Sequence, residues 1–428
     1  MQKKFSMKNL DIILTNIERN GHLVNYHFTV SRELEKYFTS NTLFLEYDRD
    51  VTCVPDSILA IPFVSSLLAF SWVLDCNLWV REIDKTFYDS VPRIREAYRE
   101  IYDHFPLKGR FVPAILTRNE LARDKKANPS AVLLFSGGAD CQATFIRNLA
   151  KSPMLCNIQG WYKSLEDEDI AADADKRDIS KFAEEYHVPT CFVRSNFAVL
   201  LTEEFDKVFA KKLGDTMWHG FLHSMAFIGI SIPIAYEAGI NEILIASSLT
   251  IGLNFLCASN LTTDSEFCYA GNGFTTHDGF ELNRQGKMGV IVKHQKSTGK
   301  PYFMRVCSFN DHNCCECEKC FRTILGIVAE GGDIKDFGFN IEGSLKQHWE
   351  DVLYRKAGLM SFKSEKFIHW PHIKKRMLEN YDIIKDKEFV DWFLSFDFDK
   401  AKREGLRRYY RQNFFSILKR KVRGVINH

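Results

Sequence analysis

The segment that most constrains the fold spans residues 133–141, LLFSGGADC, where a continuous apolar run meets two adjacent glycines. An apolar run without polar alternation, here 131–135, is typical of a strand buried on both faces of a parallel sheet. A helix is expected to begin at about Gln142, directly after the glycines. A strand joined to a helix by so short a loop predicts an α/β fold.

Strand-like and helix-like segments alternate on the C-terminal side of this loop. Strands are expected within 153–162, 189–195 and 241–248, and helices within 178–187 and 221–236. This alternation predicts a parallel sheet, of the type with about five strands, that is covered by helices on both faces.

The length of 428 residues favours more than one domain. Strand-like segments at 22–30, 41–48 and 77–84, with an amphipathic stretch at 91–105, indicate a small α+β unit at the N-terminus. After residue 331 the pattern is mostly helical. The predicted regions are 1–115 (α+β unit), 116–130 (polar linker), 131–330 (α/β domain) and 331–428 (helical region).

Composition and apolar patterning favour a cytoplasmic protein. The N-terminus lacks the apolar run of a signal peptide, so the 12 cysteines are expected as metal ligands, buried thiols or reactive thiols. The uncharged stretch 57–74 is long enough for a membrane span, but it contains Pro62 and four serines, and we interpret it as a buried helix. The net charge of +2 is too small for a whole-protein attraction to nucleic acid or membranes.

The glycine loop, Ser136 to Gly138, is suited to binding phosphate. Two glycines allow a sharp turn and bring backbone N–H groups close to a ligand. The N-terminus of the following helix adds unpaired N–H donors and a partial positive charge. Ser136 can donate a hydroxyl, and Asp140 can hold the magnesium ion of a nucleotide or cap the helix. The glycine spacing matches neither the Walker-type phosphate loop nor the dinucleotide-binding pattern.

After a buried strand, the string Ser-Gly-Gly-x-Asp resembles the signature of the PP-loop ATP pyrophosphatases, also called adenine nucleotide α-hydrolases. Ser136, Gly137, Gly138 and Asp140 match, while Cys141 stands where that family has serine. The resemblance implies that the loop binds the phosphates of ATP and that a substrate nucleophile attacks the α-phosphorus. Cys141 is a weaker hydrogen-bond donor than serine, and its place at a helix N-terminus makes it a candidate reactive thiol.

A second motif is a group of cysteines within residues 307–320. Cys307, Cys314, Cys317 and Cys320 are separated by six, two and two residues. Two Cys-x-x-Cys steps bring three thiolates around one point, and the fourth cysteine completes the tetrahedron of a structural zinc site. Cys315 is the spare thiol, although it is also an alternative ligand to Cys314. An iron–sulfur cluster and unmetallated thiols remain open.

The ending CCECEKCFR is similar to the four-cysteine zinc site of the 7-cyano-7-deazaguanine synthases, and the similarity covers about residues 131–330. It implies a divergent relative that uses ATP, Mg²⁺ and a structural Zn²⁺. Such an enzyme adenylates a carboxylate on a deazaguanine, releases pyrophosphate and passes the acyl group to ammonia. Because relatives occur in bacterial anti-phage loci, an amine of a small molecule or of another protein is an alternative acceptor.

Other candidate site residues follow the later strands. Ser247 and Ser248 are candidates for contacts with the nucleotide, with helix capping as the alternative. The polar segment TTHDGFELNRQGK supplies candidates for proton transfer, base recognition and binding of phosphate or carboxylate. These candidates are His277, Asp278, Glu281, Arg284 and Lys287.

Two pairs of residues have simpler interpretations. His219 and His223 lie four apart on one predicted helix and are interpreted as core histidines. Trp161 and Tyr162 could stack on a purine, but we expect them to be packing residues.

The C-terminal residues 400–428 carry ten Lys and Arg residues and one acidic residue, Glu404. A solvated basic helix is the simplest interpretation, and contact with nucleic acid or an anionic membrane is the other. This tail sustains an alternative function, a nucleic-acid-directed PP-loop enzyme for tRNA thiolation or lysidine-type modification. A degenerate protein that binds nucleotide without turnover is a further alternative, and an oligomeric assembly is left open.

Overall fold

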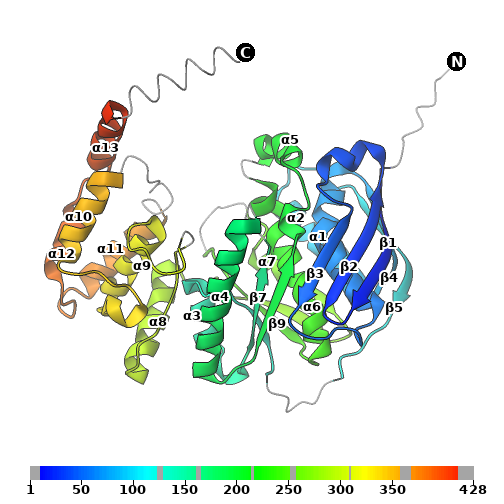
Figure 1. Ribbon diagram of the computed structural model, residues 1–428, viewed down its shortest axis with the longest axis horizontal. Helices are drawn as coiled ribbons and strands as arrows, with labels where there is room; N and C mark the ends of the chain where they lie inside the picture. The colour runs from blue at the N-terminus through cyan, green and yellow to red at the C-terminus, as the bar shows by residue number, and fades with distance from the viewer. Residues whose placement is uncertain are drawn as a thin grey trace. The chain divides into compact units, whose positions relative to one another are not determined.

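The computed structural model describes residues 10–122, 129–160, 165–213, 216–250, 257–307, 310–356 and 368–412. The chain divides into two compact units, Met1–Leu282 and Asn283–His428 (Figure 1). This division differs from the predicted boundaries after residues 115, 130 and 330. Each unit is described by itself.

The first unit is built on one 11-stranded sheet, in the order β10-β11-β9-β6-β7-β8-β3-β2-β1-β4-β5. A wholly parallel half is formed by β11 (Gly273–Asp278), β9 (Glu242–Ala246), β6 (Val132–Leu134), β7 (Met154–Gln159) and β8 (Thr190–Ser195). Nearly every residue of β7 and β9 is buried, as expected for strands covered on both faces. The predicted α/β architecture with parallel strands is therefore confirmed.

The N-terminal strands continue this sheet and do not form the separate α+β unit predicted for residues 1–115. The junction is the antiparallel pairing of β3 with β8, in which Tyr47 lies opposite Val193. This β3–β8 junction depends on backbone hydrogen bonds, which cannot be predicted from the pattern of side chains. The N-terminal strands, in sheet order, are β3 (Thr42–Tyr47), β2 (Leu23–Val30), β1 (Asp11–Asn20), β4 (Asn77–Asp84) and β5 (Arg110–Thr117).

Residues 116–122 also belong to this unit, although the sequence predicts a linker at 116–130. Asn119 is buried, and its amide nitrogen donates to Asp84 Oδ1 and to Ser57 Oγ, both at 2.9 Å. Leu121 is buried as well. Asn119, one of the polar residues on which the linker prediction is based, is therefore a buried residue with hydrogen-bond partners.

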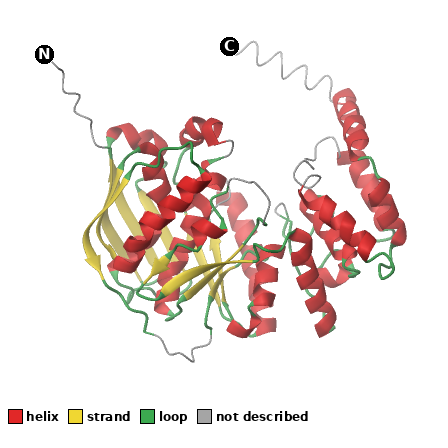
Figure 2. Ribbon diagram, turned by 180° about the vertical axis from the view of Figure 1, so that it is seen from behind, coloured by secondary structure: helices red, strands yellow, loops and turns green. Residues whose placement is uncertain are grey.

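Helices α1 (Asp56–Leu74) and α6 (His223–Glu237) pack against each other on one face of the sheet (Figure 2). Two apolar helical segments, α1 and the stretch Trp218–Glu237, are long enough to cross a membrane, but their apolar windows are 89% and 78% buried. A Cβ on Gly229 would lie 2.3 Å from the Cβ of Ser65, so the two helices approach at a residue without a side chain. The expected buried helices at 57–74 and 221–236 are confirmed.

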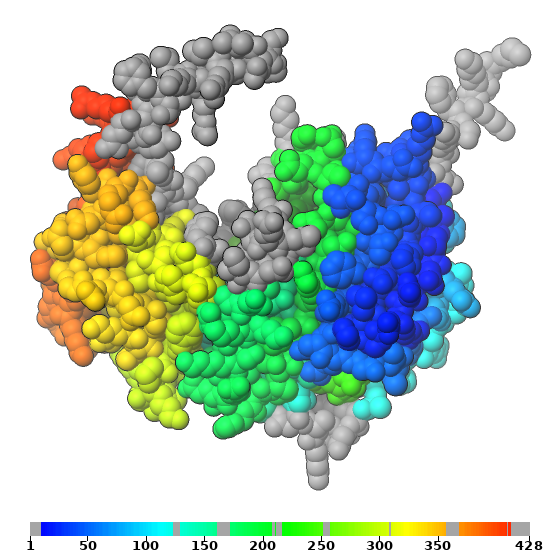
Figure 3. Space-filling view, in the orientation of Figure 1, coloured from blue at the N-terminus to red at the C-terminus, as the bar shows by residue number. Residues whose placement is uncertain are grey.

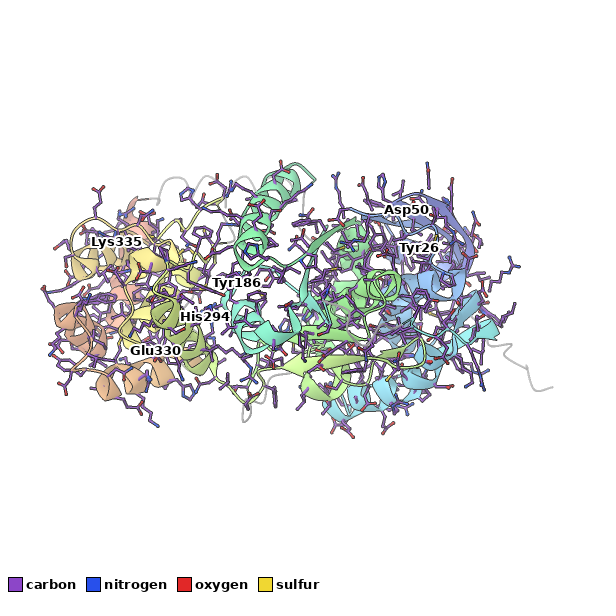
Figure 4. All side chains as sticks on the ribbon, turned by 90° about the horizontal axis from the view of Figure 1, so that it is seen from below. Tyr26, Asp50, Tyr186, His294, Glu330 and Lys335 are labelled. Carbon is purple, nitrogen blue, oxygen red and sulfur yellow. The ribbon has the colours of Figure 1, made fainter. Side chains whose placement is uncertain are left out.

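Helices α3 (Ala139–Arg147) and α4 (Leu165–Tyr186) contact the parallel strands and lie in front of them in Figure 1. On the N-terminal strands, buried residues alternate with partly exposed ones, as in a sheet with one solvated face. Figure 3 shows residues of these strands, in blue, at the molecular surface. Figure 4 places Tyr26 within this half of the sheet and the exposed Asp50 at its border.

The remaining elements of the first unit are short or lie at its edges. They are η1 (Arg32–Tyr37), α2 (Lys85–Ile101), η2 (Leu149–Lys151), η3 (Phe197–Val199), α5 (Glu203–Leu213), η4 (Trp218–Leu222), α7 (Leu261–Asp264) and β10 (Cys268–Tyr269).

The second unit is helical in its described part, as predicted for the region after residue 331. Its core is aromatic: the rings of Phe321 and Trp349 lie 4.2 Å apart, and those of Trp370 and Phe398 also lie 4.2 Å apart. Its helices are α8 (Arg284–Thr298), α9 (Glu318–Ala329), η5 (Ile334–Phe337), α10 (Leu345–Lys356), α11 (Trp370–Glu379), α12 (Lys387–Ser395) and α13 (Phe398–Gln412).

Candidate functional site

The glycine loop leaves the sheet where the strand order reverses. From β6 the chain proceeds to β7 and β8 on one side, and it returns to β9 and β11 on the other. The loops after β6 and β9 therefore diverge, although both strands end at the same edge of the sheet. Ligands of open α/β sheets bind in the crevice at such a switch point, at the carboxyl ends of the strands.

The backbone of the glycine loop is accessible to a ligand because the glycines carry no side chain. Gly137 has a φ of +74°, in the left-handed region, and a Cβ placed there would meet no atom within 4 Å. Gly138 is the N-cap of α3, which begins at Ala139, three residues before the expected position. The first turn of α3, with its unpaired N–H groups, thus follows the loop without a break.

Buried amides brace this loop from below. Asn157 of β7 donates from Nδ2 to the carbonyl of Phe135 at 3.0 Å, and Gln142 of α3 donates from Nε2 to the carbonyl of Gly137 at 3.4 Å. Both side chains are buried. An asparagine in the otherwise apolar run of β7 is the sequence signal for such a brace.

Three side chains beside the glycines differ in what they can do. Ser136 is exposed, and Asp140 lies in the first turn of α3. Cys141 is buried, and its thiol donates to the carbonyl of Gly138 at 3.0 Å. Burial raises the pKa of Cys141 to about 11. Burial and the bond to Gly138 thus favour a structural role for Cys141 over the alternative of a reactive thiol.

Ser247 and Ser248 follow β9 at the same edge. Ser247 is buried: its N–H donates to the carbonyl of Asp278 at 2.9 Å and its hydroxyl to the carbonyl of Leu249 at 2.8 Å. Ser248 is exposed. Ser247 thus shapes the loop after β9, while Ser248 presents the outward hydroxyl.

Asp278 and Glu281 share one cation on α3. Arg147 Nε lies 3.1 Å from Asp278 Oδ2, and Arg147 Nη2 lies 2.6 Å from Glu281 Oε1. The two carboxylates hold α3 against the end of β11. Because both carboxylates are engaged by the Arg147 guanidinium, they fit a positioning role better than proton transfer.

His277 points to the opposite face of β11, because successive side chains of a strand alternate. Its side chain has no exposed surface, and Nδ1 lies 2.8 Å from Asp264 Oδ2. The hydroxyl of Ser259 donates to the same oxygen at 2.9 Å. Asp264, fully buried at the end of α7, is a functional candidate that no sequence motif indicates.

Two more histidines lie at the start of α6 and in the turn before it: His223 begins α6 and His219 belongs to η4. The rings of His219 and His223 stack with centroids 5.7 Å apart, and His219 Nε2 lies 3.6 Å from Cys257 Sγ. Burial lowers the pKa of His223, whose Nδ1 lies 3.1 Å from the carbonyl of Trp218. Its neutral, half-buried ring agrees with the interpretation as a core histidine.

A cavity of about 790 Å³ opens beside α4 and the border between β8 and β3. Its lining includes Arg49, Lys176, Phe192 and Arg194, together with acidic groups such as Asp48. The ammonium of Lys176 lies 5.8 Å from the centre of the Phe192 ring. The cavity combines an aromatic face with cations, and no sequence motif points to it.

Arg284 and Lys287 belong to the second unit, where they lie in the first turn of α8. Asn283 caps this helix by accepting from the N–H of Gly286 at 2.9 Å, and Lys287 is buried. Trp161, Tyr162 and the tail beyond Gln412 lie outside the described residues.

The four-cysteine cluster, Cys307, Cys314, Cys317 and Cys320, is brought together in the second unit. Its sulfur atoms all lie within 4.8 Å of one another, and those of Cys314 and Cys320 are 4.0 Å apart. Four thiolates about 2.3 Å from a tetrahedral metal would be separated by roughly 3.8 Å. The predicted set of four cysteines is therefore arranged to hold a metal ion.

Backbone N–H groups support the cluster. The N–H of Glu316 points to Cys314 Sγ at 3.4 Å, and the N–H of Cys320 to Cys317 Sγ at 3.5 Å. Thiol–thiol hydrogen bonds from Cys317 and Cys320 lower the pKa of Cys314 and so favour its thiolate. Cys315 points instead to the carbonyl of Asn313, and burial raises its pKa to about 11, which confirms it as the spare thiol.

Asn313 ties this segment to the unit. It accepts from the N–H of Val306 at 2.9 Å and donates to the carbonyls of Met304 at 2.8 Å and Gly338 at 3.1 Å. His348 of α10 bonds to the carbonyl of Cys315 at 2.8 Å. The cysteines are thus positioned by packing on both sides.

Searches of protein-family models, of curated proteins and of solved structures find no match to this chain.

Proposed function

We propose that this protein is an ATP-dependent ligase that adenylates a carboxylate, releases pyrophosphate and transfers the acyl group to a nitrogen nucleophile. The observation that carries the proposal is the glycine loop at the switch point of the parallel strands, followed at once by the N-terminus of α3. Resemblance of Ser136–Gly137–Gly138–Ala139–Asp140 to the PP-loop signature supplies the reaction type.

The loop would act on ATP through its backbone. The left-handed Gly137 and the first turn of α3 would direct N–H groups toward an anion, and Gly137 puts no side chain in the way. Ser136 would add a hydroxyl donor, and Asp140 would hold the magnesium ion that accompanies the phosphates. These groups stabilise charge that develops as pyrophosphate leaves.

The substrate class follows from the proposed relation to 7-cyano-7-deazaguanine synthases. A carboxylate oxygen of a 7-carboxy-7-deazaguanine-like base attacks the α-phosphorus, and the acyl-adenylate then passes its acyl group to ammonia or an amine. A protein amine in an anti-phage system is one version of this acceptor. Lys176, Arg194 and the Phe192 ring of the cavity beside α4 would suit a planar, anionic substrate.

The four-cysteine cluster is proposed to bind a structural zinc ion. A set of four sulfur donors suits zinc and leaves no open position for a substrate. The cluster lies beside the N-terminus of α9, whose first residue follows Cys317. The metal would therefore fix the fold of the second unit and take no part in the chemistry.

The proposal is tested by measuring pyrophosphate release from ATP and Mg²⁺ with and without 7-carboxy-7-deazaguanine and ammonium. We expect release that requires the carboxylate, with an amide or nitrile as the acyl product. Release that requires tRNA instead would favour the nucleic-acid-directed alternative. Binding of ATP without any cleavage across these conditions would favour a protein that only binds nucleotide.

A further inference from the structure

The buried pair of His277 and Asp264 has a defined proton arrangement. A carboxylate only accepts hydrogen bonds, so the 2.8 Å contact places a proton on His277 Nδ1. Ser259 donates to the same oxygen, Oδ2, at 2.9 Å, so this oxygen acts as an acceptor toward both partners. In the neutral imidazole, Nε2 then carries the lone pair and is the basic nitrogen.

This basic nitrogen has no hydrogen-bond partner among the described residues, although it is buried. Buried polar atoms in proteins are almost always paired, and an exception calls for a ligand, a water molecule or a catalytic role. Oδ1 of Asp264 is a second such atom in the same pair. The pair therefore offers acceptors to a hydrogen-bond donor that the described residues do not supply.

The pair lies near the edge of the sheet that bears the glycine loop. His277 is opposite Ile245 of β9, and the next residue, Asp278, accepts from the N–H of Ser247. Through β9, His277 is two strands from β6, whose end leads into the glycine loop. A group held here is suited to act on a reactant bound at that edge.

We propose that His277 is the general base of the acyl-transfer step and that Asp264 is the positioning residue that holds the proton on Nδ1 and thus the lone pair on Nε2. The inference rests on the proposed function and assigns the acceptor as a small nitrogen nucleophile, ammonia, because the imidazole has no exposed surface. The acceptor nitrogen bonds to the carbonyl carbon, and the bond from that carbon to the adenylate oxygen breaks. AMP leaves with the electron pair, and Nε2 takes the proton that the nitrogen loses.

The two half-reactions separate the roles. Exchange of labelled pyrophosphate into ATP reports adenylation, whereas amide formation reports the acceptor step. His277→Gln and Asp264→Asn are expected to retain exchange and to lose amide formation from ammonium by about 10²- to 10⁴-fold. Hydroxylamine, which is unprotonated at neutral pH and a stronger nucleophile than ammonia, should restore product formation in both variants because its attack depends less on a positioned base.

Ser259→Ala gives a graded comparison, since it removes a donor to Asp264 but leaves the bond to His277. It is expected to lower amide formation by less than the His277 and Asp264 variants do, because the catalytic base is retained. Larger amines should react more slowly than ammonium in the wild type. Unchanged amide formation in the His277 and Asp264 variants, or equal rates with lysine derivatives, would overturn the inference while leaving adenylation intact.

A spectroscopic test does not depend on the variants folding. Nitrogen NMR of the full-length wild type should show a protonated Nδ1 and an unprotonated Nε2 for His277 at neutral pH, and Asp264→Asn should reverse this tautomer. A protonated Nε2 in the wild type would contradict the assignment. Absence of pyrophosphate exchange in the wild type would instead remove the proposed function and this inference together.

Discussion

The glycine loop of the first unit and the four-cysteine cluster of the second are sites of two different kinds. The loop offers backbone N–H groups, and its form depends on the φ of +74° at Gly137 and on the start of α3. The cluster offers side-chain sulfur atoms, all within 4.8 Å of one another. The type and spacing of side-chain ligands indicate which metal ion a site can hold. Backbone N–H donors indicate only that the bound group is negatively charged. For this reason the geometry of the cluster indicates a metal ion, whereas the geometry of the loop does not by itself identify a nucleotide.

The largest effect is expected at the cluster. Cys320→Ser should lose the metal ion and lower the free energy of unfolding of the second unit by several kcal/mol, because structural zinc contributes about 10–16 kcal/mol of binding energy in small domains. Metal analysis and thermal unfolding would measure both. Cys315→Ser is the control, because Cys315 points to Asn313 and not into the cluster. Full metal content and an unchanged melting temperature in Cys320→Ser would show that Cys320 is not a ligand, and wild-type protein without metal would show that the cluster is not a metal site.

The next effect concerns chemistry at the loop. Asp140→Asn should lower the rate of pyrophosphate release by about 10²- to 10³-fold, a cost of roughly 2.7–4 kcal/mol in the transition state. Asp278→Asn is the matched control, since Asp278 pairs with Arg147 on the same helix and should change the rate by less than about tenfold. Equal losses in the two variants would mean that Asp140 supports α3 and not the metal of the nucleotide.

A smaller effect tests the backbone of the loop. Gly137→Ala should lower the free energy of unfolding by about 1 kcal/mol, because a Cβ is strained at a φ of +74°. Gly138→Ala should cost much less, because its φ is −76° and the new Cβ would lie in ordinary contact, 3.5 Å from Ser136 Oγ. Urea unfolding of both variants gives the comparison. A larger loss of unfolding free energy in Gly138→Ala than in Gly137→Ala would show that Gly137 is not the strained position.

The smallest effect is the reactivity of Cys141. A pKa raised to about 11 by burial keeps the thiol protonated at neutral pH, so alkylation by iodoacetamide should be slow and should accelerate as the pH approaches 11. Because the folded pKa exceeds the ordinary value of 9.0, the group's contribution to stability is complete below about pH 9 and is lost as the pH rises from 9 toward 11. Rapid labelling of Cys141 in the folded protein at pH 7.5 would disagree with this account.

Prediction from the sequence succeeded where the pattern is local. The strand at 77–84 and the buried helix at 57–74 follow from continuous or alternating apolar residues. The spacing indicates a four-cysteine set but leaves Cys315 as an alternative to Cys314, and the structure groups Cys314 with the other three. Contacts between segments that are distant in the sequence were not predicted. The junction of β3 with β8, the ion pair of Arg147 and the partnership of Asp264 with His277 join residues 13 or more positions apart, and no spacing rule connects them.

The most direct test of the central claim follows one oxygen atom. The carboxylate substrate is labelled with ¹⁸O, and the protein is supplied with ATP, Mg²⁺ and ammonium. Attack of the carboxylate on the α-phosphorus leaves a substrate oxygen on AMP after acyl transfer, so mass spectrometry should find one ¹⁸O atom in AMP and none in pyrophosphate. Unlabelled AMP, or labelled inorganic phosphate formed together with ADP, would contradict adenylation at the glycine loop.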